Sequence, residues 1–76
     1  MPVEFFVGIN PEDRCDLEDF IYYLNSLSDP INHVAVINEF DEPDGYYMYT
    51  IHGSWAAYNK LKSCTYVKSI EHFEED

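Results

Sequence analysis

The order in which two hydrophobic periodicities follow each other is the feature of this sequence that most restricts its fold. Residues 3–9 alternate with period two and are rich in valine and phenylalanine, which is typical of a strand inside a sheet. Residues 10–13 then offer a capping side chain, a proline and two carboxylates, which suit the first turn of a helix. Five apolar residues follow at helical spacing and predict a helix that ends near residues 28–30: Leu17, Phe20, Ile21, Leu24 and Leu27.

The second half of the chain predicts a hairpin, a short helix and a last strand. Residues 33–40 and 46–52 are strand-like, and they flank the turn-forming segment 41–45. Ser54 can cap a second, short helix. Residues 65–73 contain too many β-branched and aromatic residues for a comfortable helix, so they are expected to form a strand.

Together these elements predict an α+β fold of the ferredoxin-like type, with the order β-α-β-β-α-β and two helices on one face of a four-stranded antiparallel sheet. A longer second helix in place of the last strand would give β-α-β-β-α, and the sequence leaves this alternative open. A chain of 76 residues has room for one core, so residues 1–76 are expected to form a single compact domain. Leu24 and Val36 are expected in that core.

The central strands raise the question of what covers the second face of the sheet. A solvated face is polar at every second residue, but here both alternating sets are apolar. One set is Val34, Val36, Phe40 and Met48. The other set is Ala35, Ile37, Tyr47, Tyr49 and Ile51, with Phe6 added from the first strand. A homodimer through the open sheet face, a bound partner or hydrophobic ligand, or an exposed surface rich in tyrosine would each account for this pattern.

The charge of the chain excludes several classes of partner. Fifteen Asp and Glu against four Lys and Arg give a formal net charge of -11, while 46% hydrophobic and 17% aromatic residues are enough to form a core. The excess of acid disfavours direct binding to nucleic acid and to anionic lipid surfaces. No apolar run approaches the roughly 20 residues of a membrane span, and the start lacks the basic segment of a signal peptide. We therefore expect a cytoplasmic protein without membrane association.

Residue types that often carry chemistry are present without the spacing that the chemistry needs. Cys15 and Cys64 stand far apart and outside any metal-binding or redox motif, so they are expected to be reduced thiols, with a disulfide between them as the alternative in an oxidising compartment. His33 and His52 share a sheet face in only one of two strand registers, and no metal or cofactor is predicted. Arg14 follows the first strand, as in acylphosphatase-type phosphate loops, but neighbouring acids would repel phosphate. No residues supply nucleophile, base and oxyanion donors together, so we expect no enzyme activity.

The placement of the acids is the strongest functional signal. Glu12, Asp16 and Asp19 fall at i, i+4 and i+7, so the first helix is predicted to carry a negative outer face. The hairpin adds a second group of acids, and little lysine is interleaved to relieve the repulsion. Solubility or a salt-rich habitat would explain such acids without a partner. The candidate partner-binding residues are Glu12, Asp13, Asp16, Glu18, Asp19, Tyr22, Tyr23, Glu39, Asp41, Glu42, Asp44, Tyr46 and Tyr47.

Such a surface complements a strongly basic partner. Basic grooves usually hold DNA or RNA, and an acidic domain can occupy one by presenting carboxylates where phosphates would lie. In size, acidity and aromatic content the chain resembles phage-encoded inhibitors of host defence, such as anti-restriction and anti-CRISPR proteins. The resemblance implies a non-enzymatic inhibitor of a nuclease or CRISPR effector, acting in the host cytoplasm if a virus encodes it. The alternative is a dimeric ferredoxin-like module that binds a small molecule or has a regulatory role, which explains the apolar second face better and the charge worse.

Overall fold

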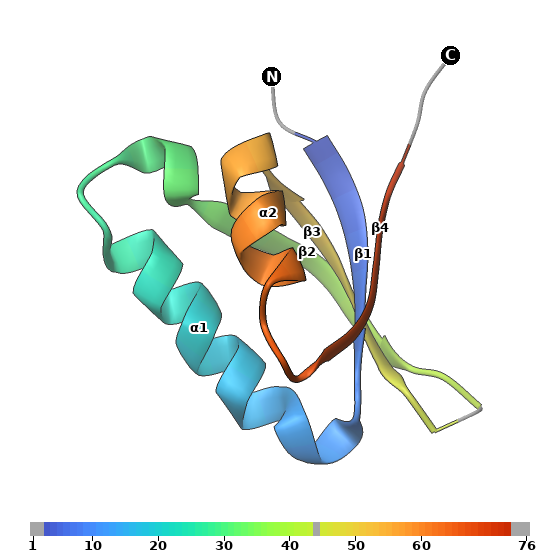
Figure 1. Ribbon diagram of the computed structural model, residues 1–76. Coiled ribbons are helices and arrows are strands. Elements are labelled where there is room, and N and C mark those ends of the chain that lie inside the picture. Colours follow the sequence, from blue (N-terminus) through green and yellow to red (C-terminus); the bar gives the residue numbers. More distant parts are fainter. Residues whose placement is uncertain (1–2, 44, 74–76) are drawn as a thin grey trace.

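A computed structural model of the chain describes residues 3–43 and 45–73 and contains the predicted order of strands and helices (Figure 1). Its elements are β1 (Val3–Ile9), η1 (Pro11–Asp13), α1 (Arg14–Ser26), η2 (Pro30–Asn32), β2 (Val34–Asp41), β3 (Tyr47–Gly53), α2 (Trp55–Lys62) and β4 (Val67–His72). The last strand is present, so the alternative with a longer second helix is wrong. The two short η segments are 3₁₀ turns that precede α1 and β2.

The four strands form one sheet in the order β2-β3-β1-β4, and all neighbouring strands are antiparallel. Each helix connects two strands that are not neighbours: α1 links β1 to β2, and α2 links β3 to β4. This arrangement is compatible with a ferredoxin-like fold. Both helices lie on the same face of the sheet (Figure 1), so the opposite face is open.

Local hydrogen bonds fix the start of α2 and the end of α1, whereas no side chain caps the start of η1 or of α1. The side chain of Ser54 accepts a hydrogen bond from the backbone N–H of Ala57 and caps α2, as its sequence position predicts. Near the end of α1, the Asn25 amide donates to the carbonyl of Val34 and accepts from its N–H, at 3.0 and 2.8 Å. These two bonds fix the end of α1 against the start of the edge strand β2.

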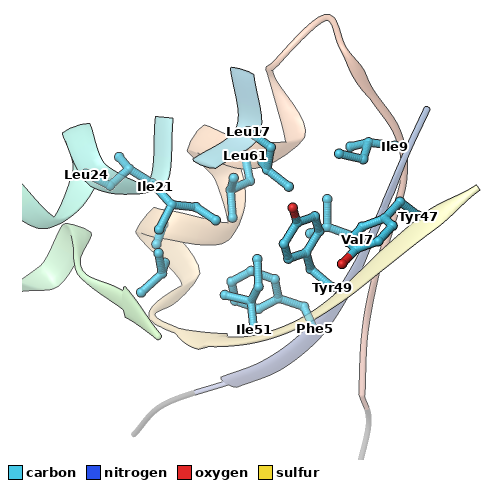
Figure 2. Packing of buried hydrophobic residues seen from close by; sticks show 12 residues of the cluster. Phe5, Val7, Ile9, Leu17, Ile21, Leu24, Tyr47, Tyr49, Ile51 and Leu61 are labelled. Atoms are coloured by element: carbon cyan, nitrogen blue, oxygen red, sulfur yellow. The ribbon is translucent and has the colours of Figure 1, made fainter. Parts of the chain in front are cut away.

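The core lies between the helices and the covered face of the sheet. Leu17, Ile21 and Leu24 are buried at the i, i+4 and i+7 positions of α1, which is the apolar face that the sequence predicts. Figure 2 shows these side chains directed toward the rings of Phe5 and Tyr49 on the sheet. The complete cluster of buried residues is Phe5, Val7, Ile9, Leu17, Ile21, Leu24, Val34, Tyr47, Tyr49, Ile51, Ala57 and Leu61.

A β-bulge in β2 changes which of its residues face the core. Val36 pairs with Ile51, but the next pair is Asn38 with Thr50, so Ile37 is an extra residue in the strand. The two sets expected from simple alternation are therefore wrong, because Val34 and Val36 share a side with Tyr47, Tyr49 and Ile51, whereas Ala35 and Phe6 share the other side with Phe40 and Met48. On the covered side β2 places Val34 and Val36, then Glu39 and Asp41, while Ala35, Asn38 and Phe40 take the open side.

Val36 is also not the core residue that the sequence predicts, because 40% of its surface is exposed. It lies on the edge strand β2, where residues from Ala35 to Asp41 are all exposed. Edge position, rather than side-chain type, decides its exposure.

The open face of the sheet is mixed in character rather than apolar throughout. Phe40 pairs with Met48, and Met48 pairs with Gly8, where an added Cβ would come within 2.9 Å of the methionine sulfur. Phe6 lies in the neighbouring row, opposite Thr50. Other residues on this face are polar: Glu4, Asn38, Thr50, His52, Ser69 and Glu71. The apolar part of the open face is thus a small group around Phe6, Phe40 and Met48.

Two further expectations concern the thiols and the membrane. Cys15 and Cys64 are free cysteines. Within residues 3–43 and 45–73, none of the helices combines the length and the apolar character that crossing a membrane requires.

The contrast between Leu24 and Val36 gives a first prediction. Leu24→Ala should lower the free energy of unfolding by about 2 to 5 kcal/mol, because this side chain is 0% exposed and its removal leaves a cavity. Val36→Ala should cost less than about 1 kcal/mol, because water already reaches the side chain. Urea denaturation of the two variants measures both values, and equal losses would contradict the assignment of the core.

Candidate functional site

The acids predicted on the first helix lie around its beginning. Glu12 and Asp13 belong to η1, and Asp16, Glu18 and Asp19 belong to the first half of α1. Asp13 is half-buried and the other four are exposed. Carboxylates at this end of a helix interact favourably with the positive end of its dipole, which partly offsets their mutual repulsion.

The acids of the hairpin approach the same side of the sheet because of the bulge in β2. Glu39 pairs with Tyr49 and Asp41 pairs with Tyr47, and directly paired residues share a face. Both carboxylates therefore project on the side that carries the helices. Glu42 follows in the turn, where the carbonyl of Tyr46 accepts a hydrogen bond from its N–H at 2.8 Å. Asp44, the remaining predicted acid, lies outside the described residues.

Two core tyrosines connect the acids of α1 with those of β2. The Tyr49 hydroxyl donates to Oε2 of Glu18 at 3.1 Å, and the Tyr47 hydroxyl donates to Oε1 of Glu39 at 3.0 Å. The two rings pack against each other with their centroids 5.2 Å apart. Glu18 and Glu39 are far apart in the sequence, but they are held by two tyrosines that contact each other.

Tyr47 has a different role from the one predicted. The sequence placed it among the contact residues for a partner, but only 7% of its surface is exposed. Its ring belongs to the core, as Figure 2 shows, and only its hydroxyl reaches the acidic surface. It positions Glu39 rather than contacting a partner through its ring.

Arg14, the chain's only arginine, lies beside the two tyrosines that hold Glu18 and Glu39. Its guanidinium carbon is 4.1 Å from the centroid of the Tyr47 ring, a cation–π contact. A hydrogen bond to Tyr49 is the main cause that raises the pKa of Arg14, and the negative charge of Glu18 acts in the same direction. A single positive charge thus lies within the acidic surface and offsets part of its repulsion.

The surroundings of Tyr49 keep its hydroxyl in the donating form. Burial is the largest cause that raises the pKa of Tyr49, to about 12, and the hydrogen bond to Glu18 contributes next. Burial likewise raises the pKa of Tyr47, followed by its hydrogen bond to Glu39. Both hydroxyls therefore stay protonated to a higher pH than an ordinary tyrosine and donate to the two carboxylates.

A third tyrosine lies on the other flank of α1. The Tyr66 hydroxyl donates to the backbone carbonyl of Asp16 at 3.2 Å. Burial chiefly raises the pKa of Tyr66, and the charges of Asp16 and Asp19 add to the effect. Asp16 and Asp19 thus lie on the flank that faces Tyr66, whereas Glu18 lies on the flank that faces the hairpin.

Not all predicted residues come together. Tyr22 and Tyr23 lie further along α1 and are exposed, Tyr22 to 78%. Tyr46 and Glu42 lie in the hairpin loop, which extends away from the helices (Figure 1). The structure brings together the acids near the start of α1 and in the second half of β2. Tyr22 and Tyr23 lie apart from these acids at one side, and Tyr46 and Glu42 lie apart from them at another.

Few opposite charges accompany these carboxylates. The ion pair in the described part of the chain joins Nε2 of His52 to Oε1 of Glu4 at 2.9 Å, on the open face of the sheet. None of the described acids on η1, α1 or the hairpin takes part in an ion pair. Lys60 and Lys62 lie in the last turn of α2, and Lys68 lies on β4. We call the described acids of η1, α1 and β2 the acidic surface: Glu12, Asp13, Asp16, Glu18, Asp19, Glu39 and Asp41.

The two histidines of the hairpin region have separate partners in the structure. His52 pairs with Ala35 and contacts Glu4, whereas His33 precedes β2 and its Nε2 lies 3.0 Å from the carbonyl oxygen of Leu27. Within the described residues there is no group of three or more His, Cys, Asp and Glu side chains suited to holding a metal ion.

Arg14 and Tyr49 are the two residues of this site that the sequence does not identify. The alternating pattern of the strand identifies Tyr49 only as an apolar residue. Its role in holding Glu18 is seen only in the folded structure, where α1 brings Glu18 to its hydroxyl. The sequence signal that could have drawn attention to Arg14 is its isolation as the only arginine, beside two acids. Comparison with protein-family models, curated protein sequences and solved structures finds no match to this chain.

The raised pKa of Tyr49 gives a second prediction. In the unfolded chain a tyrosine loses its proton near a pH of about 10, whereas the pKa of Tyr49 in the folded protein is about 12. The stability that this group contributes is complete below the unfolded value and is lost as the pH rises through that interval. The free energy of unfolding of the wild type should therefore fall more steeply above a pH of about 10 than that of Tyr49→Phe, as measured by urea denaturation. Parallel curves for the two proteins would contradict this environment for Tyr49.

Proposed function

We propose that this chain is a non-enzymatic inhibitor that binds the basic groove of a nucleic-acid-binding protein, where its carboxylates take the places of phosphates. The observation that carries the proposal is that Glu18 of α1 and Glu39 of β2, neither of which takes part in an ion pair within the described residues, accept hydrogen bonds from two tyrosines that pack against each other, with Arg14 over one of the rings. This is the type of protein that phages use against restriction enzymes and CRISPR effectors.

Fixed carboxylates suit this role better than mobile ones. Glu18 and Glu39 each accept a hydrogen bond from a ring that is itself fixed in the core, so their positions are restricted before a partner arrives. Less side-chain entropy is then lost on binding. The net charge of -11 would also accelerate the encounter with a basic groove, because long-range attraction steers the two proteins together.

The single arginine is compatible with a basic partner because it is occupied within the chain. Its guanidinium lies over the Tyr47 ring and interacts with Tyr49, although its buried Nε atom has no hydrogen-bond partner among the described residues. In this position Arg14 lowers the repulsion between Glu18 and the hairpin acids. Its charge is directed at the acidic surface rather than at an approaching lysine or arginine.

Two exposed aromatic residues could supply the part of the contact that does not depend on charge. Tyr22 and Tyr23 follow the acids along α1, and both are more than half exposed. Tyrosine is enriched among the residues that contribute most to protein–protein affinity. Such contacts would keep the complex intact at physiological salt, where exposed charges alone are screened within about 8 Å. Nucleases and CRISPR effectors act in the cytoplasm, and we place the protein there, in the host cell if a virus encodes it.

Charge reversal tests the acidic surface directly. Asp16→Lys/Asp19→Lys changes the net charge from -11 to -7, because each reversal adds two charges. The variant should fold, with equal or higher stability, since it relieves repulsion. Immobilised on a resin, it should lose the protein that the wild type captures from a lysate and releases when duplex DNA or RNA is added at constant ionic strength.

A charge-matched variant separates this surface from overall charge. Asn59→Lys/Thr65→Lys/Glu71→Lys also gives -7, because one reversal adds two charges and the other two changes add one each. All three positions are exposed and lie outside the acidic surface. It should retain the captured protein. If the two variants bind equally well, the acidic surface is not the interface, and if nucleic acid fails to displace the captured protein, mimicry is wrong.

A second candidate function is a dimeric module that binds a small molecule or has a regulatory role, and the apolar group on the open sheet face favours it. Phe40 is exposed to 40%, and it adjoins Met48 and Phe6 across β3 and β1. Burying such a group between two copies of the chain would remove it from water.

This alternative predicts a dimer that depends on Phe40. In sedimentation experiments at micromolar concentration, the wild type should be dimeric and Phe40→Lys monomeric. Tyr22→Lys is the matched control, because it changes an exposed aromatic residue on α1 instead, and it should remain dimeric. A monomeric wild type at these concentrations would exclude this alternative and leave the acidic surface as the only proposed interface.

A further inference from the structure

The two edge strands of the sheet, β2 and β4, differ in how their outer backbone groups are used (Figure 1). On β2, the side chain of Asn25 bonds to both backbone groups of Val34. Further along the same strand, the N–H of Glu39 donates to Oδ1 of Asn38 at 3.0 Å. The bulge at Ile37 lies between these two places. Occupied backbone groups and bulges both hinder the addition of another strand, so β2 is protected against further pairing.

The pairing of β4 with β1 shows which backbone groups of β4 point away from the sheet. The N–H of Phe73 donates to the carbonyl of Glu4 at 2.8 Å, and the register of the two strands places these residues directly opposite each other. In an antiparallel ladder, such hydrogen-bonded pairs alternate with pairs that are not hydrogen-bonded. Glu71 therefore bonds toward β1, whereas the N–H and C=O of Ile70 point outward. Among the described residues, no side chain bonds to these two groups of Ile70.

A cavity of about 410 Å³ lies along the same part of β4, and it is lined by Tyr58, Ile70, Glu71 and His72. Ile70 and His72 pair with core residues of β1, so their side chains stand on the covered face of the sheet. Glu71 pairs with Phe6, so its side chain stands on the open face and its backbone borders the cavity. The cavity is therefore an apolar recess between α2 and the outer edge of β4.

We propose that an extended segment of another protein adds to β4 as a fifth, antiparallel strand, with apolar side chains in the cavity and a lysine or arginine between them. Residues directly opposite each other in a sheet share a face. The segment residues opposite Ile70 and His72 then face the cavity, and the residue between them stands opposite Glu71 on the open face. Backbone hydrogen bonds supply affinity in this mode of binding, and the alternating side chains supply specificity.

Charge favours such a segment over a second copy of this chain. Two copies paired through β4 bring together two net charges of -11. A pairing centred on Ile70 places Ser69 opposite Glu71, and one centred on Glu71 places two carboxylates opposite each other. A basic residue in the segment instead gives Glu71 a partner of opposite charge, and such cross-strand pairs stabilise a sheet. This contact lies outside the acidic surface and does not require the function proposed above.

The peptide acetyl-Thr-Leu-Lys-Leu-Thr-amide carries the required alternation and tests the proposal. Its titration into isotope-labelled protein at constant ionic strength should shift the amide signal of Ile70 and protect that amide from hydrogen exchange, because the amide then donates to the peptide. The amides of β2 should not change. The isomer acetyl-Leu-Leu-Thr-Thr-Lys-amide has the same composition without the alternation, and it should bind at least about fivefold more weakly.

Methylation of single peptide nitrogens tests the backbone pairing itself. In the antiparallel arrangement the second leucine stands opposite Ile70 and turns its N–H toward β4, while the lysine turns its N–H away. Methylation of that leucine nitrogen should weaken binding about fivefold or more, because a hydrogen bond is lost. Methylation of the lysine nitrogen adds the same group and should change binding less than about twofold. Equal effects of the two methyl groups would overturn the proposed pairing.

A change of charge on the protein tests the position of the basic residue. Glu71→Lys should weaken binding of the lysine peptide about threefold or more and strengthen binding of the same peptide with glutamate in place of lysine. Glu42→Lys makes the same change of charge in the hairpin loop, and its effect should be smaller than about twofold. Thermal unfolding verifies that both variants are folded. Equal weakening by the two variants would overturn the pairing with Glu71.

Two further outcomes would contradict the proposal as a whole. The first is an Ile70 amide that stays unprotected at saturating peptide concentrations. The second is protection of this amide that rises with protein concentration when no peptide is present, because a second copy of the chain would then occupy the edge.

Discussion

The hydroxyl groups of Tyr47 and Tyr49 impose the constraint on which this structure depends. Their rings fill one end of the core, and a hydroxyl at the margin of a core must find an acceptor or lose the hydrogen bonds it makes in water. Glu18 and Glu39 meet this requirement from opposite sides, one from a helix and one from an edge strand. The packing of the core therefore also determines where these acids lie, and Arg14 takes part in both because it interacts with Tyr49 and Glu18 and lies over the Tyr47 ring.

The arrangement of strands and helices could be predicted because its signals are local. The alternation in residues 3–9 matches β1 in both limits, and Ser54 caps α2 as its position predicts. The regular spacing from Leu17 to Leu24 matches the buried side of α1. Each of these signals depends on residues close in sequence, where backbone geometry alone decides which side chains share a face.

The faces of β2 could not be predicted in the same way. Alternation assigns a face only if the strand pairs without interruption, and the bulge at Ile37 breaks that condition. The exposure of Val36 and the position of Glu39 both follow from the pairing of β2 with β3, which no local pattern encodes. For the same reason the contact between Glu18 and Tyr49, 31 residues apart, was not visible in the sequence. The acids could be recognised as a group, but not which of them share a tyrosine or an arginine.

The bulge in β2 also has a consequence for how such a protein can change during evolution. The exclusion of Ile37 from the pairing keeps Glu39 and Asp41 on the helix side of the sheet. Loss of the Ile37 codon would remove the bulge and leave both carboxylates on that side, because Asn38 would then follow Val36 in regular alternation with its present partner Thr50. If Ile37 were kept and paired with Thr50 instead, Glu39 would stand opposite Met48 on the open face. The charge pattern of this domain therefore depends on how its edge strand pairs as well as on which of its residues are charged.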